Sequence, residues 1–274
     1  MPRISKSTVL LIISVTCLAM SIAILSFALT LKNGATPIDA AAFDTTPAPD
    51  TTAEYIQSEH SETTASETPE PDETAEALPD STYIEIEPIP QDPEMPNGCE
   101  VVSLVTVLNY LGFDVDKLEF NQKYVPHGEV GKAAPDQYYV GDPTIGKPGT
   151  GFGCLAPVIT RAANAFFKDE NADYYAVNLT GTPLEELCEY VANGTPIIIW
   201  STLEMRNSPI TATWNINGTK YTWLTYSHCT VLAGYAKNHY IFADPKYGTK
   251  IYSKEKTEAA YLSQYMQAVA IFEK

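Results

Sequence analysis

A cysteine at the start of a helical apolar stripe constrains the fold of this chain more than any other feature. In Pro96-Asn97-Gly98-Cys99-Glu100, the cysteine is followed by apolar residues at helical spacing: Val101, Leu104, Val105, Leu108 and Leu111. Asn97 is a good N-cap, and Gly112 stands where a left-handed residue would end the helix. At such a helix start, unpaired N–H groups and the helix dipole favour a thiolate, so we expect the pKa of Cys99 to lie below about 8.5.

A catalytic cysteine usually also needs an imidazole and a group that orients it. His228 lies in an apolar segment, Tyr226–Tyr235, that reads as a buried strand, and the strand that follows ends in Asp244-Pro245. Adjacent strands could place His228 and Asp244 side by side. The other histidines are expected in a polar tract, a loop and a hairpin turn: His60, His127 and His239.

The order of Cys99, His228 and Asp244, with the histidine about 130 residues after the cysteine, is that of papain-like cysteine peptidases. The sequence also resembles the extracellular members of the C-39-like cysteine peptidase family, distant relatives of bacteriocin leader peptidases. The matching segments are Pro96–Leu104, Val140–Pro143, Gly151–Pro157, Gly194–Trp200, Ser227–Tyr235 and Ala243–Pro245.

The resemblance implies roles for four residues. Cys99 is the implied nucleophile, His228 the base and Asp244 its orienting partner. An oxyanion-hole glutamine is implied shortly before the cysteine, and Gln91 is the candidate, although a glutamine in this proline-rich segment could equally be a solvated linker residue. The implied chemistry is acyl transfer to the cysteine sulfur, with the oxyanion held by Gln91 and the backbone N–H of Cys99, and it requires no metal and no cofactor.

Residues 1–32 form a separate unit, in which Arg3 and Lys6 precede an uncharged apolar run from about Val9 to Leu31. About 23 residues at a rise of about 1.5 Å would extend roughly 34 Å, enough to cross a hydrocarbon core of about 30 Å. Because signal-peptide apolar regions have about 7 to 15 residues, we expect an uncleaved signal anchor with the folded domain outside the cell. Cleavage near Ser26–Ala28, which would release a secreted protein, is the alternative.

Residues 33–82 are built mainly from Thr, Glu, Asp, Pro, Ala and Ser. We expect a disordered stalk, because so few apolar side chains cannot offset the entropy lost on ordering. Most of the net charge of −17 falls in this segment. Such acidity argues against nucleic-acid binding, which needs a basic surface, and no nucleotide-binding segment is recognised.

Residues 83–274 are long enough for one domain with a sizeable core and no disulfides. We expect an α+β papain-like domain in which the Cys99 helix packs on an antiparallel sheet. Further helices are expected over about Ala156–Phe167 and from about Pro183, and a hairpin with a type I′ turn at Asn217-Gly218. The segment between Gly112 and Gly153 has little periodicity and reads as a substrate-shaping loop.

Several further residues of the domain have a structural and a functional interpretation. Cys188 is expected to pack on a helix, and Cys229, on the opposite strand face from His228, in the core. Cys154 either packs or lines the cleft. Asp136 and Asp142 either cap loop turns or bind a cation or a basic substrate group.

Three functions fit these observations. The first is an endopeptidase that acts on exported or surface peptides and proteins, and the second is an amidase that cleaves the peptide stems of the cell wall. The third is a surface binding module that keeps the fold without turnover. The absence of a recognisable sugar-binding repeat weighs against the second, and the intact Cys99, His228 and Asp244 weigh against the third. The sequence therefore predicts a membrane-anchored extracellular cysteine peptidase with a peptide or protein substrate.

Overall fold

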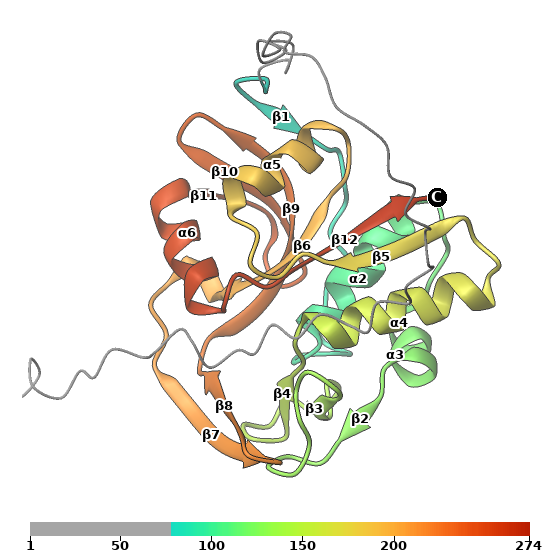
Figure 1. Ribbon diagram of the computed structural model, residues 1–274, viewed down its shortest axis with the longest axis vertical. Coiled ribbons are helices and arrows are strands. Elements are labelled where there is room, and N and C mark those ends of the chain that lie inside the picture. The colour runs from blue at the N-terminus through green and yellow to red at the C-terminus, as the bar shows by residue number, and fades with distance from the viewer. Residues whose placement is uncertain (1–77) are drawn as a thin grey trace, which may run out of the picture. The chain divides into compact units, whose positions relative to one another are not determined.

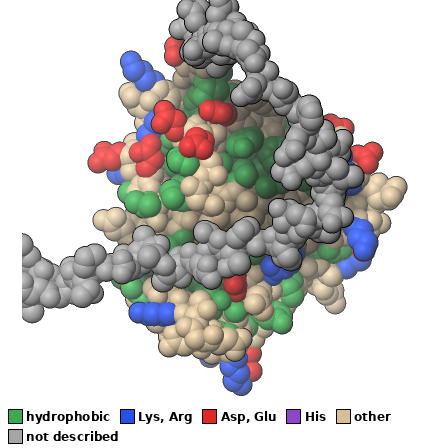
Figure 2. Space-filling view, viewed as in Figure 1, with side chains coloured by type: hydrophobic (Ala, Val, Ile, Leu, Met, Phe, Trp, Pro, Cys, Tyr) green, Lys and Arg blue, Asp and Glu red, His purple; other side chains and the backbone are tan. Residues whose placement is uncertain are grey.

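A computed structural model of the protein describes residues 78–274. The predicted anchor and most of the predicted stalk lie outside these residues, as does the strongest concentration of acidic side chains. Within residues 78–274, no helix is both long and apolar enough to cross a bilayer. Figure 2 shows acidic and basic side chains interspersed with hydrophobic ones on the face that it displays.

Helices and strands are mixed along this part of the chain. In order they are β1 (Thr82–Tyr83), α2 (Cys99–Tyr110), α3 (Lys117–Tyr124), β2 (His127–Gly128), β3 (Tyr139–Gly141), β4 (Gly151–Gly153), α4 (Ala156–Asp169), β5 (Tyr174–Asn178), α5 (Leu184–Ala192), β6 (Ile197–Thr202), the 3-10 helix η2 (Leu203–Met205), β7 (Ile210–Ile216), β8 (Thr219–Leu224), β9 (Ser227–Ala236), β10 (His239–Asp244), β11 (Gly248–Ser253), α6 (Lys254–Ser263) and β12 (Ala268–Glu273).

The main sheet has the strand order β11-β10-β9-β6-β12-β5, and β1 also pairs with β9. Each of these neighbouring pairs is antiparallel. Two smaller sheets, β2-β3-β4 and the β7-β8 hairpin, contact each other through aromatic side chains, because the rings of Phe152 and Trp214 lie 5.5 Å apart. Figure 1 shows both small sheets below the main one.

The helices form two groups around the main sheet (Figure 1). α2, α3 and α4 contact one another, and α2 packs against β9, whereas α5 and α6 pack against β6 and other strands. Strand β6 is buried along its whole length, and β9 from His228 to Tyr235. These strands therefore read as continuous apolar runs rather than alternating ones, because both of their faces are covered.

The α2 helix is held by its apolar face and by the glycine that ends it. Its apolar side chains enter the core, where Leu104, Val105 and Leu108 are fully buried. At the C-terminus Gly112 has a φ of +94°, and the N–H groups of Gly112 and Phe113 donate to the carbonyls of Asn109 and Leu108. This is the Schellman pattern expected from a glycine at this position.

Most of the predicted elements are confirmed. The helices over Ala156–Asp169 and Leu184–Ala192 are present, and Asn217 and Gly218 have φ of 50° and 87°, as a type I′ turn requires. The irregular loop predicted after Gly112 is partly wrong, because it contains α3 and the strands of the small sheet, to which His127 belongs. His239 begins β10, the strand predicted to follow that of His228, and lies directly after the turn at residues 237 and 238.

Candidate functional site

Cys99 is the first residue of α2, and the segment before it differs from the prediction. The N-cap is Gly98, without a side-chain cap, so the prediction of Asn97 as N-cap is wrong. The Asn97 side-chain amide instead donates to the carbonyl of Ile145 at 2.7 Å, and the backbone carbonyl of Asn97 accepts from the Tyr139 hydroxyl. Asn97 therefore fixes the neighbouring loop, while the nucleophile candidate still lies at the helix start.

The Cys99 thiol is buried and donates a hydrogen bond to Glu100 Oε2 at 3.3 Å. Burial, reinforced by the Glu100 charge, raises the pKa of Cys99 well above its ordinary value, although the backbone of Cys229 acts in the opposite direction. The expectation of a lowered Cys99 pKa is therefore wrong for this arrangement. The helix start favours the thiolate, but desolvation and an adjacent carboxylate outweigh it.

His228 and Asp244 lie side by side, as we predicted from their two adjacent strands. His228 Nε2 lies 3.0 Å from Asp244 Oδ1, and both side chains are almost fully buried. Asp244 Oδ1 also accepts from the backbone N–H groups of Lys246 and Tyr247. Burial raises the pKa of Asp244, but the bonds from His228 and from these N–H groups outweigh it and lower that pKa below its usual value.

The state of Asp244 defines the tautomer of His228. An ionised carboxylate only accepts hydrogen bonds, so Nε2 of His228 must carry the proton that it shares with Asp244. In a neutral imidazole, Nδ1 then has a free lone pair. His228 can therefore accept a proton at Nδ1 while Asp244 holds the ring from its other side.

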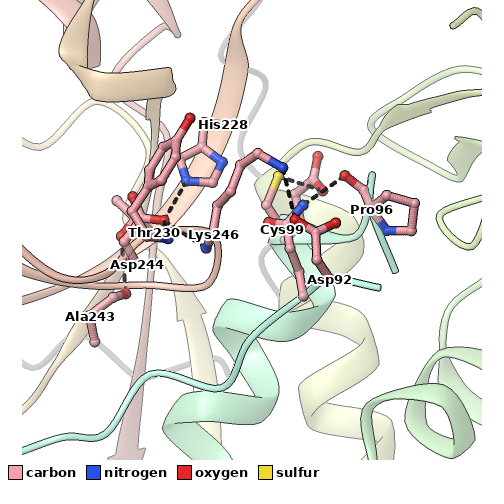
Figure 3. Close-up of polar contacts among 11 residues, drawn as sticks. Asp92, Pro96, Cys99, His228, Thr230, Ala243, Asp244 and Lys246 are labelled. Carbon is pink, nitrogen blue, oxygen red and sulfur yellow. Dashed lines mark hydrogen bonds and ion pairs between the residues drawn. The ribbon is translucent and has the colours of Figure 1, made fainter. Parts of the chain in front are cut away.

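Cys99 and His228 lie on different elements, α2 and β9, which pack against each other. Figure 3 shows Cys99 at the start of the helix and the His228 and Asp244 side chains across from it. The sulfur is close enough to β9 for the backbone of Cys229, the residue after His228, to influence its pKa. Among residues 78–274 no hydrogen bond joins Cys99 to His228, since the thiol proton is directed to Glu100. Nucleophile and base often come into contact only when substrate binds.

Gln91 is held at the start of α2 by the loop that it closes. Its Nε2 donates to the Pro96 carbonyl at 2.7 Å, and its backbone N–H donates to the carbonyl of Pro245, next to Asp244. The side chain is 2% exposed, so the alternative of a solvated linker residue is wrong. The second N–H of this amide makes no hydrogen bond within the described residues and is free to serve as a donor.

Glu100 is a member of this site that the sequence analysis did not single out. It is 2% exposed, and burial raises its pKa from 4.5 to about 7. The sequence offers one indication of this role, because Glu100 is the sole charged residue between Cys99 and Tyr110. A charge on an otherwise apolar helix is solvated unless the helix is buried on most sides, and the sequence does not reveal that burial.

The other candidate residues, cysteines and aspartates, are buried or make hydrogen bonds that support the structure. Cys99, Cys154, Cys188 and Cys229 are all free and buried, and the Cys154 carbonyl accepts from the indole of Trp200. Asp142 caps a turn by accepting from the backbone and hydroxyl of Thr144, and Asp136 accepts from Tyr221. No group of three or more His, Cys, Asp and Glu side chains in residues 78–274 has a geometry suited to a metal ion.

Comparisons with known proteins agree with the geometry. The model of the Peptidase_C39 like family matches residues 83–269. The chain belongs to this family. The uncharacterized protein YvpB of Bacillus subtilis is 32% identical over 187 residues, which are 65% of this chain and 70% of YvpB.

The crystal structure of a protein described as a C39-like peptidase from Bacillus anthracis has the same fold. It superposes with a TM-score of 0.63 at 27% sequence identity, over 70% of this chain and 98% of that chain. The described residues therefore have the α+β papain-like fold of this family, and the predicted family and fold class of the domain are confirmed.

Proposed function

We propose that this protein is a membrane-anchored extracellular cysteine peptidase that cleaves peptide bonds through Cys99, His228 and Asp244. The observation that carries the proposal is the hydrogen bond of His228 Nε2 to Asp244, which leaves Nδ1 free on a strand that packs against the helix beginning with Cys99. Membership of the Peptidase_C39 like family supports a cysteine hydrolase.

The first half of the proposed reaction forms a thioester. The Cys99 proton passes to His228 Nδ1, and the sulfur attacks the carbonyl carbon of the scissile bond. The backbone N–H of Cys99 and the free amide N–H of Gln91 stabilise the oxyanion. The C–N bond then breaks as His228 returns its proton to the departing amine.

The second half releases the acid product. Water gives a proton to His228 Nδ1 and attacks the thioester carbon, and the C–S bond breaks to regenerate the thiol as His228 gives back its proton. Asp244 stays ionised throughout, holds the imidazole in one tautomer and stabilises the imidazolium. Every group in this cycle belongs to the protein, the substrate or the attacking water.

The substrate class is tested by turnover. The full chain, with Cys99→Ser as its matched control, is incubated with a peptide library and separately with purified peptidoglycan, and products are identified by mass spectrometry. Cleaved library peptides that depend on Cys99 support the proposal. Products from peptidoglycan alone would assign the amidase function, and no product from either would favour a binding module.

The anchoring is tested by comparing the full chain with a chain that begins at Ser81. The shorter chain keeps β1, which pairs with Tyr235 and Gly234 of β9, so we expect it to fold and to retain activity. The full chain should remain in membranes after alkaline extraction, whereas the shorter chain should be soluble. Release of the full chain by that treatment would contradict the anchor and favour a cleaved signal.

A further inference from the structure

Glu100 is a buried carboxylate that the proposed acyl-transfer cycle does not use. Its Oε2 accepts from the Cys99 thiol at 3.3 Å, and its Oε1 accepts from the backbone N–H of Cys154 at 3.2 Å. Within residues 78–274 no lysine or arginine forms an ion pair with it. A buried charge without a cationic partner destabilises the folded state. The position of Glu100 beside the candidate nucleophile therefore indicates a functional role.

The Glu100 carboxylate occupies space that is open only because residue 153 is glycine. A Cβ on Gly153 would come within 2.0 Å of Glu100 Oε1 and 2.9 Å of the Trp223 ring, so only glycine fits there. Cys154, whose N–H binds Oε1, is itself fixed, because its carbonyl accepts from Trp200 Nε1 at 2.8 Å. Glu100 is therefore held in place from the β4 side while its other oxygen faces the sulfur.

The titratable groups around Glu100 come from four segments. They are Cys99 on its own helix, Cys154 after β4, Tyr139 on β3 and Cys229 on β9. All four are acids that are neutral in this setting, so none offsets a negative charge. Burial accordingly raises the pKa of Glu100 to about 7, even though the hydrogen bonds from Cys99 and Cys154 act in the other direction.

We propose that Glu100 is a positioning residue that sets the protonation of Cys99 and confines the peptidase to acidic and neutral surroundings. As a carboxylate, it accepts the thiol hydrogen bond, and its charge opposes a thiolate. As a carboxylic acid, it donates a hydrogen bond to the thiolate while the Cys99 proton resides on His228. This inference rests on the proposed role of Cys99 as nucleophile.

The two states differ by one proton. The active state holds protons on Glu100 and on both nitrogens of His228, with Cys99 as a thiolate. The inactive state holds one on the Cys99 thiol and one on His228 Nε2, with Glu100 ionised. Because the groups titrate together, the pH at which the thiolate is lost belongs to the set and follows the protonation of Glu100.

The test measures the rate at which iodoacetamide alkylates Cys99 in the full chain between pH 6 and pH 8, with the site identified by mass spectrometry. Glu100→Gln keeps an oxygen for the Cys154 N–H and cannot ionise. At pH 8 about a tenth of wild-type molecules carry protonated Glu100, given its pKa of about 7. We therefore expect Glu100→Gln to react about as fast as wild type at pH 6 and about tenfold faster at pH 8.

A control variant separates this effect from a change in net charge. Glu170→Gln alters an exposed carboxylate at the end of α4, and its profile should match that of wild type. A ratio between Glu100→Gln and wild type that stays constant from pH 6 to pH 8 would overturn the proposal and leave Glu100 a structural residue.

Two further measurements keep the result unambiguous. If Glu100→Gln does not fold, the wild-type profile decides: a rate that levels off or falls above pH 7 supports the proposal, and a tenfold rise per pH unit overturns it. Turnover by Cys99→Ser tests the nucleophile separately. If Cys99→Ser loses turnover while Glu100→Gln and wild type give superimposable alkylation profiles, the role of Glu100 is refuted. The role of Cys99 as nucleophile then stands.

Discussion

Two buried carboxylates flank the site and behave in opposite ways. Asp244 and Glu100 are each 2% exposed, yet the pKa of Asp244 is lowered and that of Glu100 is raised to about 7. Asp244 accepts from an imidazole and from two backbone N–H groups, whereas Glu100 accepts from one backbone N–H and a thiol. Equal burial is thus accompanied by pKa shifts in opposite directions, because the hydrogen-bond donors differ.

The two carboxylates lie on different parts of the fold. On the sheet, Asp244, whose pKa is lowered, is ionised at neutral pH and fixes one tautomer of His228. On the helix, Glu100 lies next to the sulfur and changes charge near neutral pH. Pairs of carboxylates whose environments drive their pKa values apart are typical of acid and base assignments in enzymes.

The largest expected effect lies on the sheet side. His228→Ala removes the proton acceptor and should lower kcat/KM on the order of 10⁶-fold, whereas Asp244→Asn keeps the imidazole but allows the wrong tautomer and should cost on the order of 10⁴-fold. Steady-state kinetics on a peptide found in the library screen measure both. Equal losses with an intact fold would mean that Asp244 does more than orient the ring.

Gln91→Ala should have the next largest effect. Removing an oxyanion donor costs about 10² to 10³ in kcat, or about 3 to 4 kcal/mol, with little change in KM. Thr106→Ser, on α2 outside the site, is a suitable control because its hydroxyl bond to the Val102 carbonyl is retained. A kinetically silent Gln91→Ala would remove Gln91 from the mechanism and leave the roles of Cys99 and His228 intact.

Much of the fold could be predicted because its signals are local. The α2 stripe, the Gly112 end and the Asn217-Gly218 turn each depend on a few neighbouring residues. Helices α3 and α6 were missed because their apolar periodicity is weak. Their N-caps, Asp116 and Ser253, which accept from backbone N–H groups of the first turn, were the signals available.

The site was less predictable because its energetics depend on long-range burial. The pairing of His228 with Asp244 follows from two adjacent strands, and the sequence was sufficient for it. The raised pKa of Cys99 and the contact between Glu100 and Cys154 depend on how α2 packs against β4 and β9. A dipole argument from the helix start alone has the wrong sign once desolvation is included.

Stability should depend on pH in opposite ways for the two carboxylates. The contribution of Glu100, whose folded pKa is raised from 4.5 to about 7, is fully present below pH 4.5 and is lost as pH rises through 7, by about 3 kcal/mol at most. Asp244, whose folded pKa is lowered, contributes above its unfolded pKa and loses that contribution as pH falls through its folded pKa.

Urea unfolding of the two amide variants measures this difference. From pH 5 to pH 8, Glu100→Gln should gain stability relative to wild type. Asp244→Asn should be less stable than wild type at pH 7 and approach it in acid. If the stability of both variants relative to wild type changed in the same direction with pH, the opposite pKa shifts of the two carboxylates would be contradicted.

The smallest effect is expected for the ion pair that joins the two sides of the site. Lys246 Nζ lies 3.0 Å from Asp92 Oδ2, next to Gln91, and both side chains are partly exposed. Exposed pairs contribute about 0 to 1 kcal/mol, so Lys246→Ala should lower the unfolding free energy by no more than about 1 kcal/mol. The backbone N–H of residue 246 still donates to Asp244 in the variant. We therefore expect kcat to stay within about fivefold of wild type, the factor that corresponds to about 1 kcal/mol. A loss of turnover as large as that of Gln91→Ala would show that the ammonium, rather than the loop backbone, holds Gln91 against the helix start.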